Sequence, residues 1–199
     1  PLYPSYSSVE KRKINIAYIG INNHEIDLIA PFIEALKCEN VKNSYRLILY
    51  GNTISNEKWN QLGLSEIAEY RGWLDYSKDV STLKDIDVFL QLLDDNNVSK
   101  AGWPNKLGDY LAFGKPVILS PYGDIIDFVK NEKGFFIVEY NKYSILKILQ
   151  EIKDIPYSDL KTMGYANRQL AEKISWKNRA KNIEYICNKI RFNNETVKN

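Results

Sequence analysis

Two patterns of hydrophobic and polar positions alternate along most of the chain. Short apolar runs such as residues 14–20 end in glycine or in polar turn residues, which is typical of buried strands. Between these runs, apolar residues recur three or four positions apart, as Ile26, Ile29 and Ile33 do, which is typical of a helix with one buried face. The sequence therefore predicts strands and helices in alternation.

Six runs have the strand pattern, and helical segments lie between them. The predicted strands cover residues 14–20, 45–50, 68–71, 87–92, 116–120 and 134–138, and the predicted helices between them cover residues 25–37, 55–62, 78–84, 104–113 and 124–130. Strands that alternate with helices pair in parallel through right-handed crossovers. The predicted fold class is α/β: a Rossmann-like, doubly wound parallel sheet of about six strands with helices on both faces.

The two ends of the chain have different patterns. After residue 138 the strand pattern stops, and additional C-terminal helices are predicted at residues 144–153, 157–173 and 176–191, the last with one apolar face and with Ser175 as its N-cap. Residues 1–13 carry proline, serine and charge without periodicity, so we expect a linker or N-terminal extension there. The predicted domain covers residues 14–191, and the polar residues 192–199 are expected to fray.

Composition and charge exclude several classes of protein. A chain of 199 residues with 44% hydrophobic and 26% charged residues is expected to fold as one domain. Its net charge of +2 gives no overall positive field of the kind that a nucleic-acid-binding protein uses, so no nucleic-acid partner is expected. Cys38 and Cys187 lie far apart without metal-ligand spacing, so we expect no metal site and a reducing compartment.

The same reasoning bears on localisation. No run approaches the about 18 apolar residues of a membrane span, and residues 1–13 lack the apolar core of a secretory signal. We therefore expect a cytoplasmic protein without a membrane span, with peripheral membrane association through another domain or a binding partner as an alternative. The chain begins with Pro1 and its one methionine is Met163, which favours an excised domain or a processed chain.

The most informative polar positions follow the predicted strand at residues 87–92. Ligands of open α/β sheets bind beyond the carboxyl ends of the strands, where the strand order reverses. Pro104 suits the first turn of a helix, which leaves the main-chain amides of Asn105, Lys106 and Leu107 free to bind an anion, and the Lys106 side chain adds a charge. Asp109 is placed to accept hydrogen bonds from two vicinal hydroxyls, as on a ribose. The sequence thus predicts a diphosphate and ribose site.

Other interpretations of these positions stay open. The segment from Pro104 is also compatible with an ordinary buried crossover helix, in which Asp109 compensates Lys106 as an i,i+3 pair. After the first strand, Gly20 allows close approach of a phosphate, whereas Asn22 and Asn23 are either ligand contacts or turn formers. Trp73 either stacks on a nucleotide base or packs against protein.

Residues 103–118 resemble the signature segment of the C-terminal domain of GT-B glycosyltransferases, in particular glycosyltransferase family 4. Their sequence is Trp-Pro-Asn-Lys-Leu-Gly-Asp-Tyr-Leu-Ala-Phe-Gly-Lys-Pro-Val-Ile, and the family pattern is Glu-Ala-Met-Ala-x-Gly-x-Pro-Val. The resemblance implies that Asp109 replaces the glutamate that binds the ribose, that Gly20 is the phosphate-loop glycine, and that the segment around Trp73 receives the base. The last helix of the family usually crosses back to the N-terminal domain.

Two departures from the family pattern concern charge. The family places a second glutamate, which contacts the donor sugar, at the position of Ala101. The family also has an arginine and a lysine after the first strand, where this chain has residues 21–25 without either. Lys106 and Lys100 are the available substitutes for the missing positive charge.

The resemblance implies the donor-binding domain of a retaining, hexosyltransferase-like enzyme of polysaccharide biosynthesis. Such an enzyme transfers a sugar from a nucleoside diphosphate sugar to a glycan or a lipid-linked saccharide and needs no cofactor. No catalytic residue is assigned, because the acceptor-activating groups come largely from an N-terminal acceptor-binding domain, in cis or as a separate chain, and the isolated domain is expected to be inactive. The alternatives are a stand-alone nucleotide-sugar-binding subunit and a degenerate, non-catalytic interaction domain. A dinucleotide oxidoreductase is not supported, since no Gly-x-Gly-x-x-Gly follows the first strand.

Overall fold

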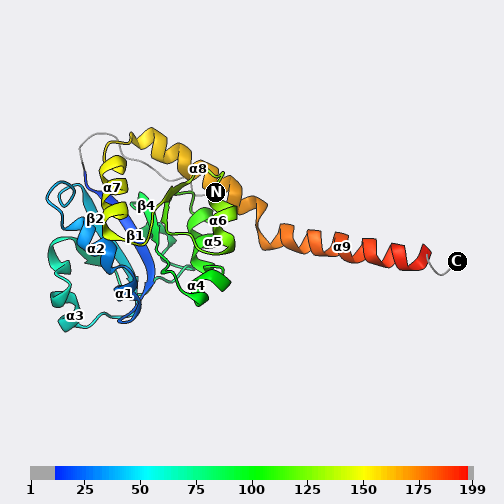
Figure 1. The fold of residues 1–199 in the computed structure, drawn as a ribbon, viewed down its shortest axis with the longest axis horizontal. Coiled ribbons are helices and arrows are strands. Elements are labelled where there is room, and N and C mark those ends of the chain that lie inside the picture. Colours follow the sequence, from blue (N-terminus) through cyan, green and yellow to red (C-terminus); the bar gives the residue numbers. More distant parts are fainter. Residues whose placement is uncertain (1–11, 197–199) are drawn as a thin grey trace.

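The computed structural model describes residues 12–196 and, within them, side chains up to residue 190. A parallel six-stranded sheet forms its centre, with the order β3-β2-β1-β4-β5-β6 (Figure 1). The strands are β1 (Ile14–Ile21), β2 (Tyr45–Gly51), β3 (Ala68–Tyr70), β4 (Val88–Gln91), β5 (Val117–Leu119) and β6 (Phe135–Ile137). The predicted doubly wound sheet is confirmed, and its order reverses between β1 and β4.

Helices occupy the connections between strands, with several differences from the prediction, among them the 3-10 helix η2 in place of the helix predicted at residues 78–84. The helices are α1 (Glu25–Leu28), α2 (Ala30–Leu36), α3 (Asn56–Gln61), α4 (Asn97–Ala101), α5 (Asn105–Ala112), α6 (Asp124–Val129), α7 (Lys142–Ile152), α8 (Tyr157–Lys173) and α9 (Trp176–Thr196), with 3-10 helices η1 (Leu64–Glu66) and η2 (Val80–Leu83). The helix predicted at residues 25–37 is broken at Ile29, because Pro31 in the first turn of α2 has no N–H to continue the ladder. The short helix α4, which the Asn96 side chain caps at Ser99 N (2.8 Å), was not predicted.

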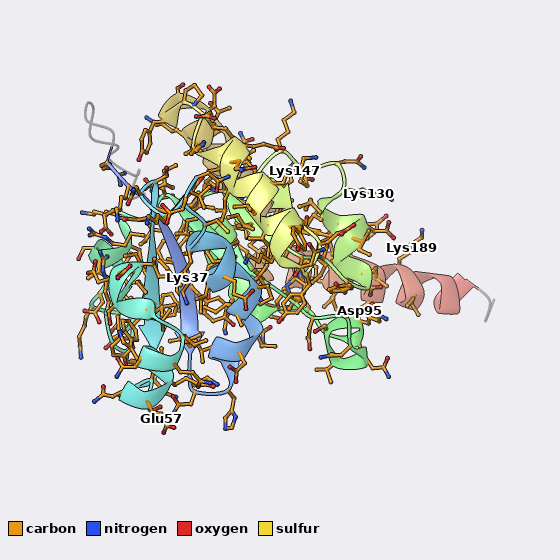
Figure 2. All side chains as sticks on the ribbon, turned by 60° about the vertical axis from the view of Figure 1, so that its left-hand side comes forward. Lys37, Glu57, Asp95, Lys130, Lys147 and Lys189 are labelled. Atoms are coloured by element: carbon orange, nitrogen blue, oxygen red, sulfur yellow. The ribbon has the colours of Figure 1, made fainter. Side chains whose placement is uncertain are left out.

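The helices cover both faces of the sheet and form two cores. Side chains of β1 alternate, so that Ile16 and Tyr18 belong to one core and Ala17 and Ile19 to the other. Helices α2 and α7 contribute to the first core, and α5 and α6 to the second. Glu57, Lys130 and Lys147 are examples of charged side chains on the outside of these layers (Figure 2).

The two predicted domain boundaries move outward. Of the predicted linker at residues 1–13, residues 1–11 lie outside the described range, and Arg12 belongs to the domain, because its guanidinium donates to both carboxylate oxygens of the buried Asp87 (2.9 and 2.7 Å). At the other end, α9 is a helix as far as Thr196 in the structure, and residues 197–199 lie outside the described range.

Helix α9 extends away from the body of the domain (Figure 1). It begins where predicted, and the Ser175 hydroxyl accepts a hydrogen bond from Asn178 N (3.4 Å), as an N-cap does. Its apolar side chains stay exposed: Trp176 (83%), Ile183 (62%), Tyr185 (68%), Ile186 (54%) and Ile190 (57%). The apolar face predicted for this helix is therefore present, and none of the described residues covers it.

Helix α5 is fixed at the point where β1 and β4 separate. The register between these two strands consists of the pairs Ile16–Val88 and Ala17–Phe89, whereas β1 pairs with β2 along its whole length. Beyond the last pair with β4, the main-chain amide of Ile19 donates to the hydroxyl of Tyr110 (3.1 Å), and the Tyr110 ring stacks on Phe89 with centroids 4.3 Å apart. Tyr110, which is fully buried, thus ties α5 to both strands at the reversal of strand order.

This anchoring predicts the effect of Tyr110→Phe. The substitution keeps the ring but leaves the buried Ile19 amide without an acceptor, so we expect the free energy of unfolding to fall by about 1–3 kcal/mol. Chemical denaturation measures the loss, and Tyr165→Phe, at an exposed tyrosine of α8, is the matched control with no expected change. An equal response of the two variants would contradict the anchoring role.

Candidate functional site

The side chain of Lys106 lies across the end of β1. Lys106 belongs to the first turn of α5, and Gly20 near the end of β1 has a positive φ of 85°. A Cβ atom on Gly20 would lie 2.8 Å from Cε and 2.9 Å from Nζ of Lys106. The positive φ favours glycine at position 20, and a Cβ atom there would displace the flexible end of the Lys106 side chain from its present position. The structure brings the two predicted site residues together at the reversal of strand order.

The Lys106 ammonium has two partners from the first β-α unit. Its Nζ donates to Glu25 Oε2 (3.2 Å) and to the Tyr18 hydroxyl (3.5 Å), and it lies 4.8 Å from the centroid of the Tyr18 ring. Burial, with a further contribution from the charge of Glu25, raises the pKa of Tyr18, so this hydroxyl stays neutral. Lys100, the other proposed source of positive charge, is paired with Asp95 instead.

The first turn of α5 offers two main-chain donors rather than three. Pro104 is the N-cap residue of α5 and not its first helical residue, and its carbonyl accepts a hydrogen bond from Leu107 N (2.9 Å). The prediction of Leu107 as a free donor is therefore wrong, and its fully buried side chain makes it a core residue. Within the described part of the chain, the amides of Asn105 and Lys106 donate to no protein acceptor. These two amides and the positive end of the helix dipole form the main-chain part of an anion site.

The two asparagines after β1 act as turn formers. The side-chain oxygen of Asn22 accepts from His24 N (2.8 Å) and Glu25 N (2.9 Å), which fixes the start of α1. The side-chain oxygen of Asn23 accepts from Ser55 N (2.9 Å) and ties this loop to the segment after β2. The structure thus supports the turn-forming interpretation, and through Asn22 the turn positions the Glu25 carboxylate near Lys106.

Asp109 faces the loop that follows β3. It is an exposed residue, and desolvation by the surrounding protein raises its carboxyl pKa, whereas a hydrogen bond from Tyr76 opposes that rise. Burial raises the pKa of Tyr76 to about 12, and its ring stacks on Phe113 with centroids 6.3 Å apart. The alternative in which Asp109 compensates Lys106 does not match these contacts, because Lys106 pairs with Glu25.

Trp73 stands in the same loop, three residues before Tyr76, with 70% of its surface exposed. The alternative of a tryptophan packed in the protein is therefore wrong. The exposed indole offers a flat surface on which a planar ring can stack.

The sequence did not point to Glu25, Tyr76 or Tyr110 as parts of this region. Their partners are Lys106, Asp109 and Ile19, and each partner lies far away along the chain. One signal was available for Glu25, because it follows the predicted phosphate loop closely in sequence.

Two kinds of feature are absent from the described residues. Among residues 12–190, whose side chains the structure describes, no group of three or more His, Cys, Asp or Glu side chains is arranged to hold a metal ion. No helix within residues 12–196 combines the length and apolar character that crossing a membrane requires.

Comparisons with known proteins match this architecture. The family model of "Glycosyl transferases group 1" matches residues 13–154. No match was found among curated protein sequences. Sucrose-phosphate synthase from Thermosynechococcus elongatus has a similar structure, with a TM-score of 0.68 and 14% identity over 92% of this chain and 46% of that chain. HepE of Anabaena, solved in complex with UDP, has a TM-score of 0.61 and 14% identity over 81% of this chain and 44% of that one.

A third similar structure is itself a single domain. It is the C-terminal domain of the group 1 family protein LpcC from Francisella tularensis, with a TM-score of 0.59 and 15% identity over 86% of this chain and 94% of that chain. In contrast, the chain spans less than half of sucrose-phosphate synthase and of HepE (46% and 44%). The family match and the shared fold lead to one conclusion: this chain belongs to the group 1 glycosyltransferases and has the fold of the C-terminal domain of a GT-B enzyme.

Proposed function

We propose that this chain is the donor-binding domain of a retaining, hexosyltransferase-like enzyme that acts in polysaccharide biosynthesis. It binds a nucleoside diphosphate sugar, whose sugar is transferred to a glycan or a lipid-linked saccharide. The observation that carries the proposal is the position of Lys106 across Gly20, beside two unpaired amides at the start of α5. A helix N-terminus with free amides and a lysine is a site for phosphate oxygens, and it lies where open α/β sheets bind ligands.

The nucleoside binds next to this anion site. Asp109 lies one helical turn after Lys106 and accepts hydrogen bonds from the ribose hydroxyls, and the exposed Trp73 stacks on the base. In the proposed arrangement, the nucleoside lies toward Tyr76, and the distal phosphate with its sugar lies toward Lys106. HepE was solved with UDP, which supports a uridine nucleotide as the first ligand to test.

The domain contributes to catalysis by stabilising the negative charge of the leaving group. When the bond to the sugar breaks, the departing nucleoside diphosphate gains negative charge, and fixed donors aimed at its oxygens stabilise that charge. Lys106 and the amides of Asn105 and Lys106 are such donors, and the proposal needs neither a metal ion nor a further cofactor. The acceptor is held and activated by an N-terminal domain, in cis or as a separate chain, so the isolated domain binds donor without turnover.

Helix α9 supplies the surface for that second domain. Its exposed apolar side chains, Ile183 and Ile190 among them, lie on a helix that extends away from the donor-binding domain (Figure 1). Exposed apolar surface of this kind marks an interaction site. The proposed compartment is the cytoplasm, where Cys38 and Cys187 persist as the free thiols that the structure contains.

A degenerate, non-catalytic domain is the second candidate, and one observation favours it. Glu25 neutralises Lys106, and Ala101, at the position of the family's second glutamate, supplies no carboxylate. A site without net charge holds a diphosphate less tightly. Absence of binding in titrations with UDP, GDP and ADP would decide for this candidate.

Two substitutions separate the phosphate and ribose parts of the proposed site. Lys106→Ala is expected to weaken the binding of inorganic pyrophosphate and of whichever nucleotide binds most tightly, by roughly ten- to a hundredfold. The reason is that it removes a charge-assisted hydrogen bond. Asp109→Ala is expected to weaken nucleotide binding roughly tenfold and to leave pyrophosphate binding unchanged, because pyrophosphate has no ribose. Calorimetric titration measures both dissociation constants.

Lys130→Ala is the matched control for these titrations. Lys130 follows α6, pairs with the exposed Asp127 and points outward in Figure 2, so its removal should change neither affinity. Equal nucleotide affinities of the wild type and Lys106→Ala would contradict the proposed diphosphate site.

Truncation tests the separate role of α9. A chain that ends at Ser175 retains the sheet, α5 and the loops of the site, so its nucleotide affinity should stay within about twofold of the full chain. Calorimetry on the two proteins measures the difference. Loss of nucleotide binding on truncation would show instead that α9 belongs to the donor site.

A further inference from the structure

The Glu25 carboxylate is held within the site that is proposed for the donor diphosphate. It comes from the first turn of α1, which Asn22 fixes, and its Oε2 lies 3.2 Å from Lys106 Nζ. The exposed fractions of the two side chains are 33% for Glu25 and 30% for Lys106, so both reach solvent. A ligand that contacts the Lys106 ammonium therefore also meets a carboxylate.

A carboxylate at this position distinguishes between chemical groups of a ligand. It repels phosphate oxygens, and it accepts hydrogen bonds from hydroxyls. The nucleoside lies toward Asp109 and Tyr76 in the proposed site, so the groups that face Glu25 are the distal phosphate and whatever is attached to it. In a nucleoside diphosphate sugar the attached group carries several hydroxyls.

The free nucleoside diphosphate presents a different group to Glu25. Its terminal phosphate ionises a second time with a pKa near 6, so at neutral pH it carries about one more negative charge than the sugar ester. That charge lies on the distal phosphate, the part of the ligand nearest to Glu25. The same carboxylate thus meets a hydroxyl donor in one ligand and an additional anion in the other.

We propose that Glu25 is a specificity-determining residue that makes the site prefer the sugar-bearing donor over the free nucleoside diphosphate. The inference rests on the proposed function and assigns to Glu25 a contact with the hydroxyls of the donor sugar. Its pairing with Lys106 has a second effect, since it holds the lysine across Gly20 before the donor arrives. Discrimination against the free nucleotide also favours its release after transfer.

The test compares two ligands of one nucleotide in two variants. Calorimetry gives the dissociation constants of UDP and UDP-glucose, or of the GDP or ADP pair if that nucleotide binds more tightly. Glu25→Gln removes the charge and keeps an acceptor oxygen, so we expect the free nucleotide to bind roughly three- to tenfold more tightly and the sugar ester to change less than about twofold. Glu25→Ala also removes the acceptor, so the sugar ester should bind more weakly, by roughly threefold or more, while the free nucleotide again binds more tightly than to the wild type.

The readout is the ratio of the two dissociation constants within each protein. A merely structural role of Glu25 would shift both affinities alike and leave this ratio at its wild-type value, which would overturn the inference. Glu132→Gln is the matched control, because Glu132 precedes the edge strand β6, whereas Glu25 follows the central strand β1, and its ratio should equal that of the wild type. Thermal denaturation confirms that each variant is folded.

The outcome also separates this inference from the proposed function. If the wild type binds none of the three nucleotides and none of their sugar esters, the donor-binding proposal fails and Glu25 has no ligand to select. If the wild type binds and Lys106→Ala does not, while the ratio is unchanged in both Glu25 variants, the donor site stands and the role of Glu25 is refuted.

Discussion

The reversal of strand order between β1 and β4 is the constraint on which the rest of the structure depends. Chain segments that leave these two strands pass to opposite faces of the sheet, so no connection covers the edge between them. Here the separation begins early, because the register of the two strands ends at Ala17 and Phe89. The amide of Ile19 would then lack an acceptor, and the Tyr110 hydroxyl supplies it from α5. One hydrogen bond thus satisfies the strand and fixes the helix whose first turn carries Lys106.

Electrostatics in the site follow from that arrangement. The dipole and free amides of α5 create an excess of positive potential where the helix begins, and Lys106 adds to it. Positive potential of this kind attracts a counter-ion, and the carboxylate of Glu25, from the neighbouring β-α unit, pairs with Lys106. The arrangement keeps the lysine extended across Gly20 rather than free in solvent. An anionic ligand therefore meets a preorganised cation but has to compete with a resident carboxylate.

The sequence predicted those features that depend on local pattern. Alternating periodicities gave the parallel α/β sheet, and the rule for open sheets placed Gly20 and Lys106 in one region before any contact between them was known. The prediction for Leu107 is wrong because it depends on where the helix begins. Pro104 suits the first helical position, yet it is the N-cap residue of α5, and its carbonyl accepts a hydrogen bond from the Leu107 amide. A shift of one residue at a helix start is within the usual uncertainty of a helix boundary, and here it changes which amides are free.

Tertiary contacts were beyond the reach of local pattern. Tyr110 has the spacing of an ordinary core residue in the sequence. Its hydroxyl accepts a hydrogen bond from Ile19 N because β1 and β4 separate there, which the sequence pattern does not show. Likewise, Asn22 and Asn23 carry side chains suited to a ligand or to a turn, and the choice depends on where His24 and Ser55 lie. Polar side chains in loops are ambiguous in sequence for this reason, since the backbone donors that they satisfy are defined only by the fold.

Under the proposed function, the Glu25–Lys106 pair sets a compromise between two steps of transfer. Charge develops on the leaving diphosphate as the bond to the sugar breaks, and in the proposed mechanism Lys106 and the α5 amides lower the free energy of that state. Glu25 opposes the same charge, so it reduces the stabilisation that Lys106 alone would give. Faster release of the free nucleotide after the reaction offsets this loss of stabilisation, because a tightly retained nucleotide would make product release rate-limiting. A single lysine with a counter-ion therefore suits a site whose product is more negative than its substrate, whereas an unopposed cluster of cations would favour capture over turnover.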